Sequence, residues 1–183
     1  MPRAFIGVGS NIDPEKNVKE ALRLLAIRSS VLKISTVYHT EPELRPEQPW
    51  YYNCVAEIDT ELRPEELKFA LLRGIEKKLG RKRTADKFAE RTIDLDLLLY
   101  GDPSVESTGL FVQDPDIFQR PYLAAALLEL SPGLKLREPE GLQTRVPEAA
   151  LAATPPEVLP SKMEILEAYS QSLRKEILHG GEC

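Results

Sequence analysis

Apolar positions along the first hundred residues recur with two periods, one typical of β-strands and one typical of helices. Runs rich in apolar and β-branched residues predict four strands, at Ala4–Val8, Leu32–Thr40, Asn53–Thr60 and Thr92–Tyr100. Apolar residues spaced three to four apart predict two helices, Pro14–Ala26 and one from Pro64 to Leu79. The resulting order, β-α-β-β-α-β, is that of a ferredoxin-like α+β fold with an antiparallel sheet.

The same pattern predicts which faces of these elements are buried. In the third strand, Cys54, Ala56 and Ile58 occupy every second position, which is typical of a strand with one buried face. The apolar stripe of the second helix consists of Leu67, Leu71, Ile75 and Leu79. Gly80 follows this stripe and predicts the end of the helix.

The last part of the chain has a different character. A hairpin-like segment (Val105–Val112) and a helix (Pro121–Leu130) precede the proline-rich stretch Arg137–Pro160, which we expect to be irregular. The capping-box pattern Ser161-Lys162-Met163-Glu164 then predicts a helix over about 162–178. Its apolar stripe consists of Leu166, Tyr169, Leu173 and Ile177. We therefore expect a domain over residues 1–133 and a helical extension over 134–183, which packs on the domain or forms a homodimer.

Composition excludes several classes of protein. With 42% hydrophobic and 29% charged residues among 183, the chain is typical of a soluble globular protein. We see neither an apolar run long enough to span a bilayer nor a signal peptide, and the two cysteines suggest no disulfide framework. We expect a cytoplasmic protein without a membrane partner. A net charge of −5 makes nucleic acid an unlikely partner for the whole surface.

Several common catalytic motifs are absent from the sequence. The run Gly7-Val8-Gly9-Ser10-Asn11 lacks the third glycine of a dinucleotide-binding loop, and there is no GxxxxGK[ST] phosphate loop. His39 and His179 are the only histidines, so histidine-based zinc chemistry has little support.

The segment Arg91-Thr92-Ile93-Asp94-Leu95-Asp96 carries the strongest chemical signal. Residues two apart on a strand point to the same side, so Asp94 and Asp96 share a face about 7 Å apart. Adjacent carboxylates repel each other unless a cation lies near them, and Mg²⁺ favours one or two carboxylates together with substrate phosphates. The alternative is an amphipathic strand whose polar face is simply solvated.

Two neighbouring features favour a phosphorylated, aromatic ligand. Five cationic residues lie just before the carboxylates and match a polyphosphate: Arg81, Lys82, Arg83, Lys87 and Arg91. The aromatic cluster Trp50-Tyr51-Tyr52, followed by Asn53, suits a flat heteroaromatic ring with a hydrogen-bonding edge. A solvated basic loop or a weak RNA patch, and aromatic residues that belong to the core, remain the alternatives.

In these residues the chain resembles the 6-hydroxymethyl-7,8-dihydropterin pyrophosphokinase family of folate biosynthesis, from Phe5 to about Pro132. The similarity is strongest in the Arg91–Asp96 segment. The other similar segments are Ile6-Gly7-Val8-Gly9-Ser10-Asn11, Tyr38-His39-Thr40-Glu41-Pro42, Gln48-Pro49-Trp50-Tyr51-Tyr52-Asn53, Ile75-Glu76 and Leu79-Gly80-Arg81. Several such segments in the right order are more specific than any one of them.

The resemblance implies transfer of pyrophosphate from ATP to the hydroxymethyl group of the pterin, with release of AMP. It implies that Asp94 and Asp96 hold two Mg²⁺ ions and act in catalysis together with Arg81 and Arg91. The pterin-binding residues that it implies are Thr40, Pro42, Tyr51, Asn53 and Tyr122. The ATP-binding residues that it implies are Glu76, Arg81, Arg83, Lys87, Phe88, Arg91 and Arg120.

The chain departs from the family pattern at two places. Lys87-Phe88-Ala89-Glu90 stands where the family has an Arg-Trp-Gly-Pro-like run, so the aromatic residue lacks an indole N–H. Gln113-Asp114-Pro115 stands where the family has Pro-His-Pro, so a carboxylate replaces an imidazole. These changes leave a second hypothesis open, a diverged relative that binds pterin or nucleotide without catalysis. A third is an RNA-binding module with a ferredoxin-like sheet, although Asn53–Thr60 offers no exposed aromatic residue for it.

Overall fold

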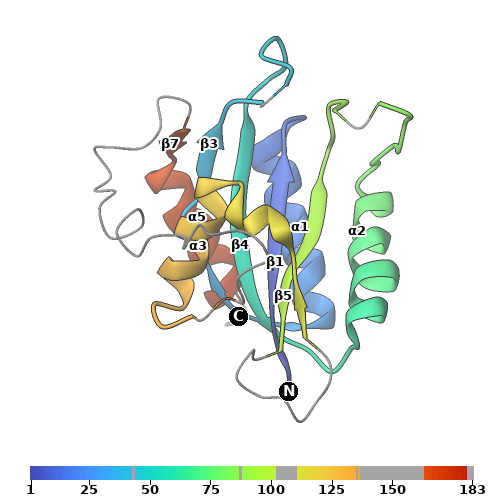
Figure 1. The fold of residues 1–183 in the computed structure, drawn as a ribbon. Helices are drawn as coiled ribbons and strands as arrows, with labels where there is room; N and C mark the ends of the chain where they lie inside the picture. The colour runs from blue at the N-terminus through green and yellow to red at the C-terminus, as the bar shows by residue number, and fades with distance from the viewer. Residues whose placement is uncertain (43, 87, 102–110, 135, 137–162, 181–183) are drawn as a thin grey trace.

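One antiparallel sheet organises the chain, with helices on both of its faces (Figure 1). The computed structural model describes residues 1–42, 44–86, 88–101, 111–134, 136 and 163–180. In these residues the strand order is β6-β5-β1-β4-β3-β7, and β2 also pairs with β4. The strands are β1 (Arg3–Ser10), β2 (Ser30–Ile34), β3 (Tyr38–Thr40), β4 (Tyr51–Asp59), β5 (Asp94–Tyr100), β6 (Val112–Gln113) and β7 (Met163–Ile165). The predicted α+β class with an antiparallel sheet is confirmed.

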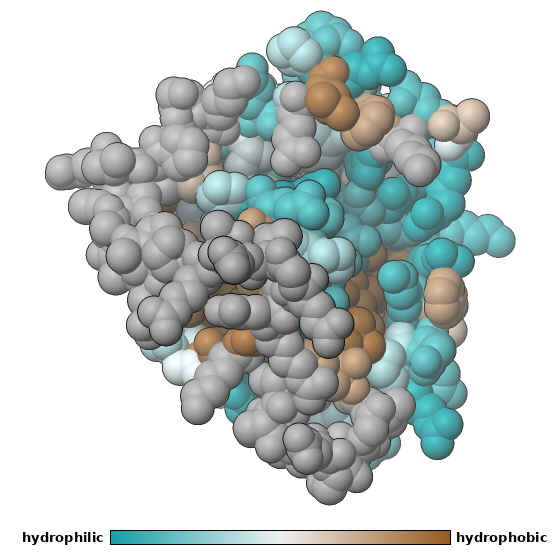
Figure 2. Space-filling view, in the orientation of Figure 1, coloured by the Kyte–Doolittle hydropathy of each residue, from teal (hydrophilic) through white to brown (hydrophobic). Residues whose placement is uncertain are grey.

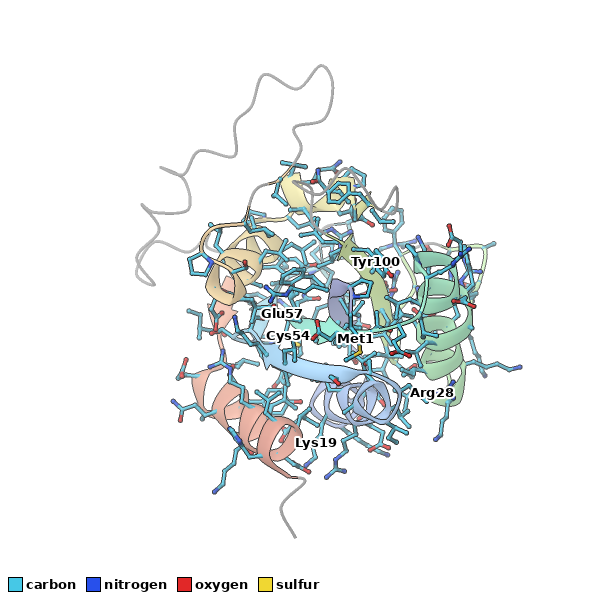
Figure 3. All side chains as sticks on the ribbon, turned by 90° about the horizontal axis from the view of Figure 1, so that it is seen from below. Met1, Lys19, Arg28, Cys54, Glu57 and Tyr100 are labelled. Atoms are coloured by element: carbon cyan, nitrogen blue, oxygen red, sulfur yellow. The ribbon has the colours of Figure 1, made fainter. Side chains whose placement is uncertain are left out.

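The helices bury two separate apolar clusters, one on each face of the sheet. Seen from below, the sheet separates α1 and α5 from α3 (Figure 3). The helices are α1 (Pro14–Arg28), η1 (Glu66–Leu72), α2 (Arg73–Lys78), η3 (Pro115–Phe118), α3 (Pro121–Leu130) and α5 (Glu167–His179). Among the described residues, each helix is too short or too polar to cross a bilayer.

The predicted strand Leu32–Thr40 is wrong as a single element, because it divides into β2 and β3. At the break, the backbone N–H of Ser35 donates to the carbonyl of Val55 (2.9 Å), and its hydroxyl accepts from the N–H of Val55 (2.9 Å). The next two N–H groups turn away from β4. That of Thr36 donates to the carboxylate of Glu129, and that of Val37 donates to the hydroxyl of Ser170. Side chains from α3 and α5 thus accept the hydrogen bonds that carbonyl groups of β4 would accept if the strand were continuous.

Strand β4 is buried on both faces, whereas the sequence pattern predicts one buried face. Residues 53–58 are all buried, because α1 and α5 cover one side and α3 covers the other. Glu57 lies on the α3 side and is 1% exposed. Its carboxylate pairs with Nε of Arg3 at 3.0 Å and with Nζ of Lys33 at 3.3 Å. These ion pairs allow a glutamate to be buried, although a glutamate in the sequence suggests an exposed position.

The second predicted helix forms, but its first part is a π-helix, η1. The wider turn shifts the buried stripe by one residue, so that Leu67 and Leu72 are fully buried while Leu71 is half-buried. Gly80 ends the helix at φ +79°, as predicted. The N–H of Gly80 donates to the carbonyl of Lys77 and that of Arg81 to the carbonyl of Glu76, which is a Schellman motif.

The predicted start of the C-terminal helix is wrong. Ser161 and Lys162 of the capping-box pattern lie outside the described residues, and Met163–Ile165 forms strand β7 beside β3. The helix, α5, begins at Glu167 and packs its predicted stripe on the domain, with Leu173 only 1% exposed. Of the predicted hairpin-like segment, residues 105–110 also lie outside the described part of the chain.

Candidate functional site

A cavity of about 580 Å³ lies at the end of the sheet where β1 ends and β4 and β5 begin. Its walls come from strands β1, β3, β4, β5 and β7, from η3 and α3, and from the loops that follow β3 and α2. Hydrophilic side chains gather at this end of the molecule, with a few hydrophobic ones among them (Figure 2). The cavity therefore offers both polar and apolar surface to one ligand.

The floor of the cavity is the backbone of β1. Gly9 is paired with Asn53 on β4 and with Asp94 on β5, and Gly7 is paired with Asp96. A Cβ atom on Gly9 would lie 2.7 Å from Oδ1 of Asn53, which is closer than real Cβ contacts. Because β1 carries no side chains there, a ligand can extend from the amide on β4 to the carboxylates on β5.

All five residues implied for the pterin pocket line this cavity: Thr40, Pro42, Tyr51, Asn53 and Tyr122. The side-chain amide of Asn53 donates to the hydroxyl of Thr40 at 2.8 Å, and both residues are buried. Tyr51 and Tyr122 add aromatic surface from β4 and α3. The structure thus brings together one fixed hydrogen-bonding amide and two aromatic rings.

Asp94 and Asp96, also in the lining, differ in their electrostatic surroundings. Burial would raise the pKa of Asp94, but the guanidinium groups of Arg81 and Arg91 bond its carboxylate and hold the pKa below its usual value. Asp96 faces the cavity, where partial desolvation and the negative charges of Asp94 and Asp114 raise its pKa to about 6. The local field at Asp96 therefore attracts a cation.

Glu76 lies behind strand β5, which carries Asp94 and Asp96. Its buried carboxylate accepts from the N–H of Leu95 (3.0 Å) and from Arg83 (2.9 Å), and it also bonds Arg81. The Schellman motif at Gly80 directs Arg81 toward both Glu76 and Asp94. Glu76, Arg81 and Arg83, which were predicted to face ATP, lie outside the cavity lining, so their roles at the nucleotide stay predictions.

Two loops meet over the cavity. Arg45 pairs with Asp86 at 3.0 Å, and Nε2 of Gln48 donates to the carbonyl of Phe88 at 2.9 Å. Arg45, Gln48 and Phe88 all line the cavity. Lys87, which was predicted to bind ATP, lies outside the described residues.

Helix η3 and the residues that flank it bring a further cation and two carboxylates to the cavity. Arg120 pairs with Asp116 at 3.2 Å and donates to the hydroxyl of Tyr122 at 3.3 Å. Asp114 caps η3, because its Oδ1 accepts from the N–H of Asp116 at 2.9 Å. The cap fixes the Asp114 carboxylate near Asp96, where its charge contributes to the raised pKa.

The donor set fits a magnesium ion whose coordination is completed by a ligand. Among the described residues, no group of three or more His, Cys, Asp or Glu side chains is arranged to hold a metal. Asp94 and Asp96 provide two carboxylates, and the carboxylate of Asp114 adds negative charge near Asp96. Mg²⁺ commonly binds one or two carboxylates and takes its other ligands from phosphates and water, so this site suits Mg²⁺ together with a nucleotide.

Several lining residues had no predicted role in the site. Among them are Leu44, Arg45, Asp116, Leu123 and Met163, and also Gln48, which was noted only as part of a segment similar to the family. Arg45 and Gln48 lie in the polar loop before the aromatic cluster, where the nearby motifs could have drawn attention to them. Met163 lies in a segment whose pattern predicted a helix, so no pattern in the sequence indicated a role in the cavity.

Comparisons with known proteins bear on the same region. The sequence model of the family described as 7,8-dihydro-6-hydroxymethylpterin-pyrophosphokinase (HPPK) matches residues 5–132. Two similar relatives are 2-amino-4-hydroxy-6-hydroxymethyldihydropteridine pyrophosphokinases. That of Bacillus subtilis is 37% identical over 69% of this chain and 77% of its own length, and that of Haemophilus influenzae is 35% identical over 74% and 86%.

Other relatives are much longer than the matched region. The folic acid synthesis protein fol1 of Pneumocystis carinii is 36% identical over 69% of this chain, which spans 17% of that protein, and the folate synthesis bifunctional protein of Arabidopsis thaliana is matched over 26% of its length. The crystal structure of Plasmodium falciparum HPPK-DHPS shares the fold, with a TM-score of 0.54 at 11% identity over 98% of this chain and 45% of that one.

Proposed function

The chain belongs to the 7,8-dihydro-6-hydroxymethylpterin-pyrophosphokinase (HPPK) family, and on this premise we propose that it transfers pyrophosphate from ATP to 6-hydroxymethyl-7,8-dihydropterin in folate biosynthesis. One observation carries the proposal. A single cavity joins the Asn53–Thr40 amide and hydroxyl pair to the Asp94–Asp96 carboxylates across the glycine floor of β1. The family match favours this transferase over the RNA-binding alternative.

The pterin would bind at the β3–β4 side of the cavity. Its ring stacks against Tyr51 and Tyr122, and the Asn53 carboxamide bonds its heteroatom edge. The Asn53 side chain is fixed by Thr40, so little rotamer entropy is lost on binding. This arrangement would direct the hydroxymethyl group toward the carboxylates on β5.

The triphosphate of ATP would bind at the β5 side, near Arg91 and Arg120. The pterin hydroxyl oxygen attacks the β-phosphorus of ATP and loses its proton, while the bond from this phosphorus to the α–β bridging oxygen breaks and AMP leaves. Arg91, which lines the cavity, and Arg81, which does not, both bond Asp94 in this structure, and we expect both to stabilise the charge that develops on the phosphates. Asp94 and Asp96 would hold two Mg²⁺ ions, which neutralise phosphate charge when bound.

Three finer predictions are part of the proposal. The order β1-α1-β2-β3-β4-η1-α2-β5, in which β2 and β3 take the place of one strand, supports a ferredoxin-like core, and we propose a cytoplasmic location. A homodimer through the C-terminal helix would have to use the exposed polar face of α5, since its apolar stripe packs on the same chain. Sedimentation velocity distinguishes a monomer from such a dimer.

AMP release tests the proposed reaction. Purified protein with ATP and Mg²⁺ should form AMP and pterin pyrophosphate, resolved by chromatography, only when 6-hydroxymethyl-7,8-dihydropterin is added. Asp96→Ala should lower the rate at least about a hundredfold because it removes a metal ligand, without unfolding the protein. Asp59→Ala, at the opposite end of β4, is the matched control and should retain the rate. Pterin binding without AMP release would instead select the non-catalytic relative.

A further inference from the structure

We propose that strand β7, held in place by α5, brings Met163 into the pterin site, where this side chain forms a wall that sets affinity and specificity for the pterin ring. The inference rests on the proposed function and extends it to a part of the chain beyond residue 132, where the family match ends. It also gives a role to a segment that sequence analysis left without one.

The register of β7 places Met163 at the cavity. Met163 is paired with Thr40 of β3, and both residues line the cavity. Thr40 is the residue whose hydroxyl fixes the Asn53 amide. Met163 also packs against the apolar cluster that includes Leu123 of α3, and Leu123 lines the cavity as well.

The position of β7 in the sheet assigns Met163 to the pterin end. In the order β5-β1-β4-β3-β7, four inter-strand spacings separate β7 from β5. At about 4.8 Å for each spacing, Met163 lies about 19 Å across the sheet from the Asp94–Asp96 strand. A methionine thioether is flexible and polarisable and makes favourable contacts with aromatic rings, which suits a flat pterin and not a phosphate.

The segment after Met163 is firmly anchored, so this wall is part of the folded domain. The N–H of Leu166 donates to the carbonyl of Val37 (2.9 Å), and the N–H of Val37 donates to the hydroxyl of Ser170 (2.8 Å). Arg174 donates to the carbonyl of Ile34 at 2.8 Å, and Leu173 is buried in the core. Helix α5 therefore fixes both β7 and the neighbouring β3.

Steady-state kinetics on the full chain test the role of Met163. Met163→Ala removes the thioether and should raise the KM for the pterin about tenfold, while the KM for ATP and kcat stay within about twofold. Met163→Gln keeps the length but loses the apolar contact and should have a similar effect. Met163→Leu should stay near the wild-type value. Glu164→Gln, on the opposite face of β7, is the control and should change neither KM.

The possible results separate this inference from the proposed function. If wild-type protein neither binds pterin in equilibrium dialysis nor forms AMP, the proposed function fails and the inference fails with it. If wild-type protein is active but Met163→Ala and Met163→Gln leave the pterin KM unchanged, only the inference is overturned. Equal loss toward pterin and ATP, with a lowered Tm, would also overturn it, because that pattern reports a structural role alone.

Discussion

Gly9 of β1 lies between the functional side chains of β4 and those of β5. It is paired with Asn53 on one side and with Asp94 on the other. The carboxamide oxygen of Asn53 occupies the space that a Cβ atom of residue 9 would need. At this position, the missing side chain serves a close approach between strands and not a turn.

Gly9→Ala should weaken pterin binding about tenfold. The added Cβ would lie 2.7 Å from Oδ1 of Asn53 and displace an amide that Thr40 otherwise fixes. Equilibrium dialysis with the pterin measures the change. Gly74→Ala in α2 is the matched control, because a Cβ there meets nothing within 4 Å. This control should retain pterin affinity and gain about 0.5–1 kcal/mol of stability from helix propensity. Unchanged affinity in Gly9→Ala would contradict the role of the glycine.

Residue-level prediction succeeded where chemistry depends on local spacing. The strand period alone puts Asp94 and Asp96 on one face, and both line the cavity. The strand period could not identify Met163, because Met163 reaches the cavity only through the pairing of β7 with β3, which lies more than a hundred residues earlier in the chain. Nor could spacing indicate that Glu76 is buried behind the lining, since only tertiary packing supplies its partners.

At the level of elements, one ion pair and one hydrogen bond join the described residues of the two loops over the cavity. Arg45 and Asp86 form an ion pair between half-exposed side chains, and such pairs contribute only about 0–1 kcal/mol. Gln48 adds one hydrogen bond to the backbone at Phe88. A ligand that bridges both loops could therefore strengthen a weak existing contact, as many active-site loops close over substrates.

Amide hydrogen exchange should report this closure. We expect fast exchange in residues 83–86 and 88–90 of the free protein and slower exchange with an ATP analogue and pterin together. Arg45→Ala should raise exchange of the free loop by up to about fivefold, since it removes the ion pair with Asp86. Lys68→Ala, exposed on η1, should leave the loop unchanged. Exchange that is insensitive to both ligands would contradict loop closure.

Helix and strand boundaries were predicted best where side-chain pattern and backbone signal agree. Pro121–Leu130 and the end of the second helix at Gly80 match the structure. The break between β2 and β3 was missed because it depends on Ser170 and Glu129, which lie far away in the sequence. The strand β7 was missed because a capping-box pattern describes local preference, whereas β3 offers an open edge.

For the whole molecule, buried hydroxyl and thiol groups predict a loss of stability in alkali. Burial raises the pKa of the Cys54 thiol from 9.0 to about 12, and burial together with Glu129 raises the pKa of Tyr38 from 10.0 to about 12. Above pH 9 the unfolded chain releases these protons before the folded protein does. The folded state is therefore fully favoured below pH 9 and loses stability as pH rises toward 12.

Urea unfolding at pH 8.0, 9.0, 9.5 and 10.0 measures this effect. The free energy of unfolding should fall with a slope that approaches about 1.4 kcal/mol per pH unit for Cys54 alone. A further measurement at pH 11 should show a steeper fall, because Tyr38 then contributes as well. Cys54→Ala should be flatter between pH 9 and 10, even if its stability at pH 8 is lower. If the free energy of unfolding of Cys54→Ala depended on pH as that of the wild type does, the loss of stability would come from groups other than Cys54.

The place of β7 at the end of the sheet has a consequence for solubility. Without it, Tyr38–Thr40 would be an outer strand whose free amide and carbonyl groups could pair with another chain. Strand β7 occupies those groups within the same molecule. Strand β7 then becomes the outer strand, but it is only three residues long and has the charged Glu164 at its centre, and short, charged edges discourage pairing with another chain. The segment that brings Met163 to the cavity thus also limits edge-to-edge aggregation, so one piece of backbone serves both the ligand and the colloidal stability of the chain.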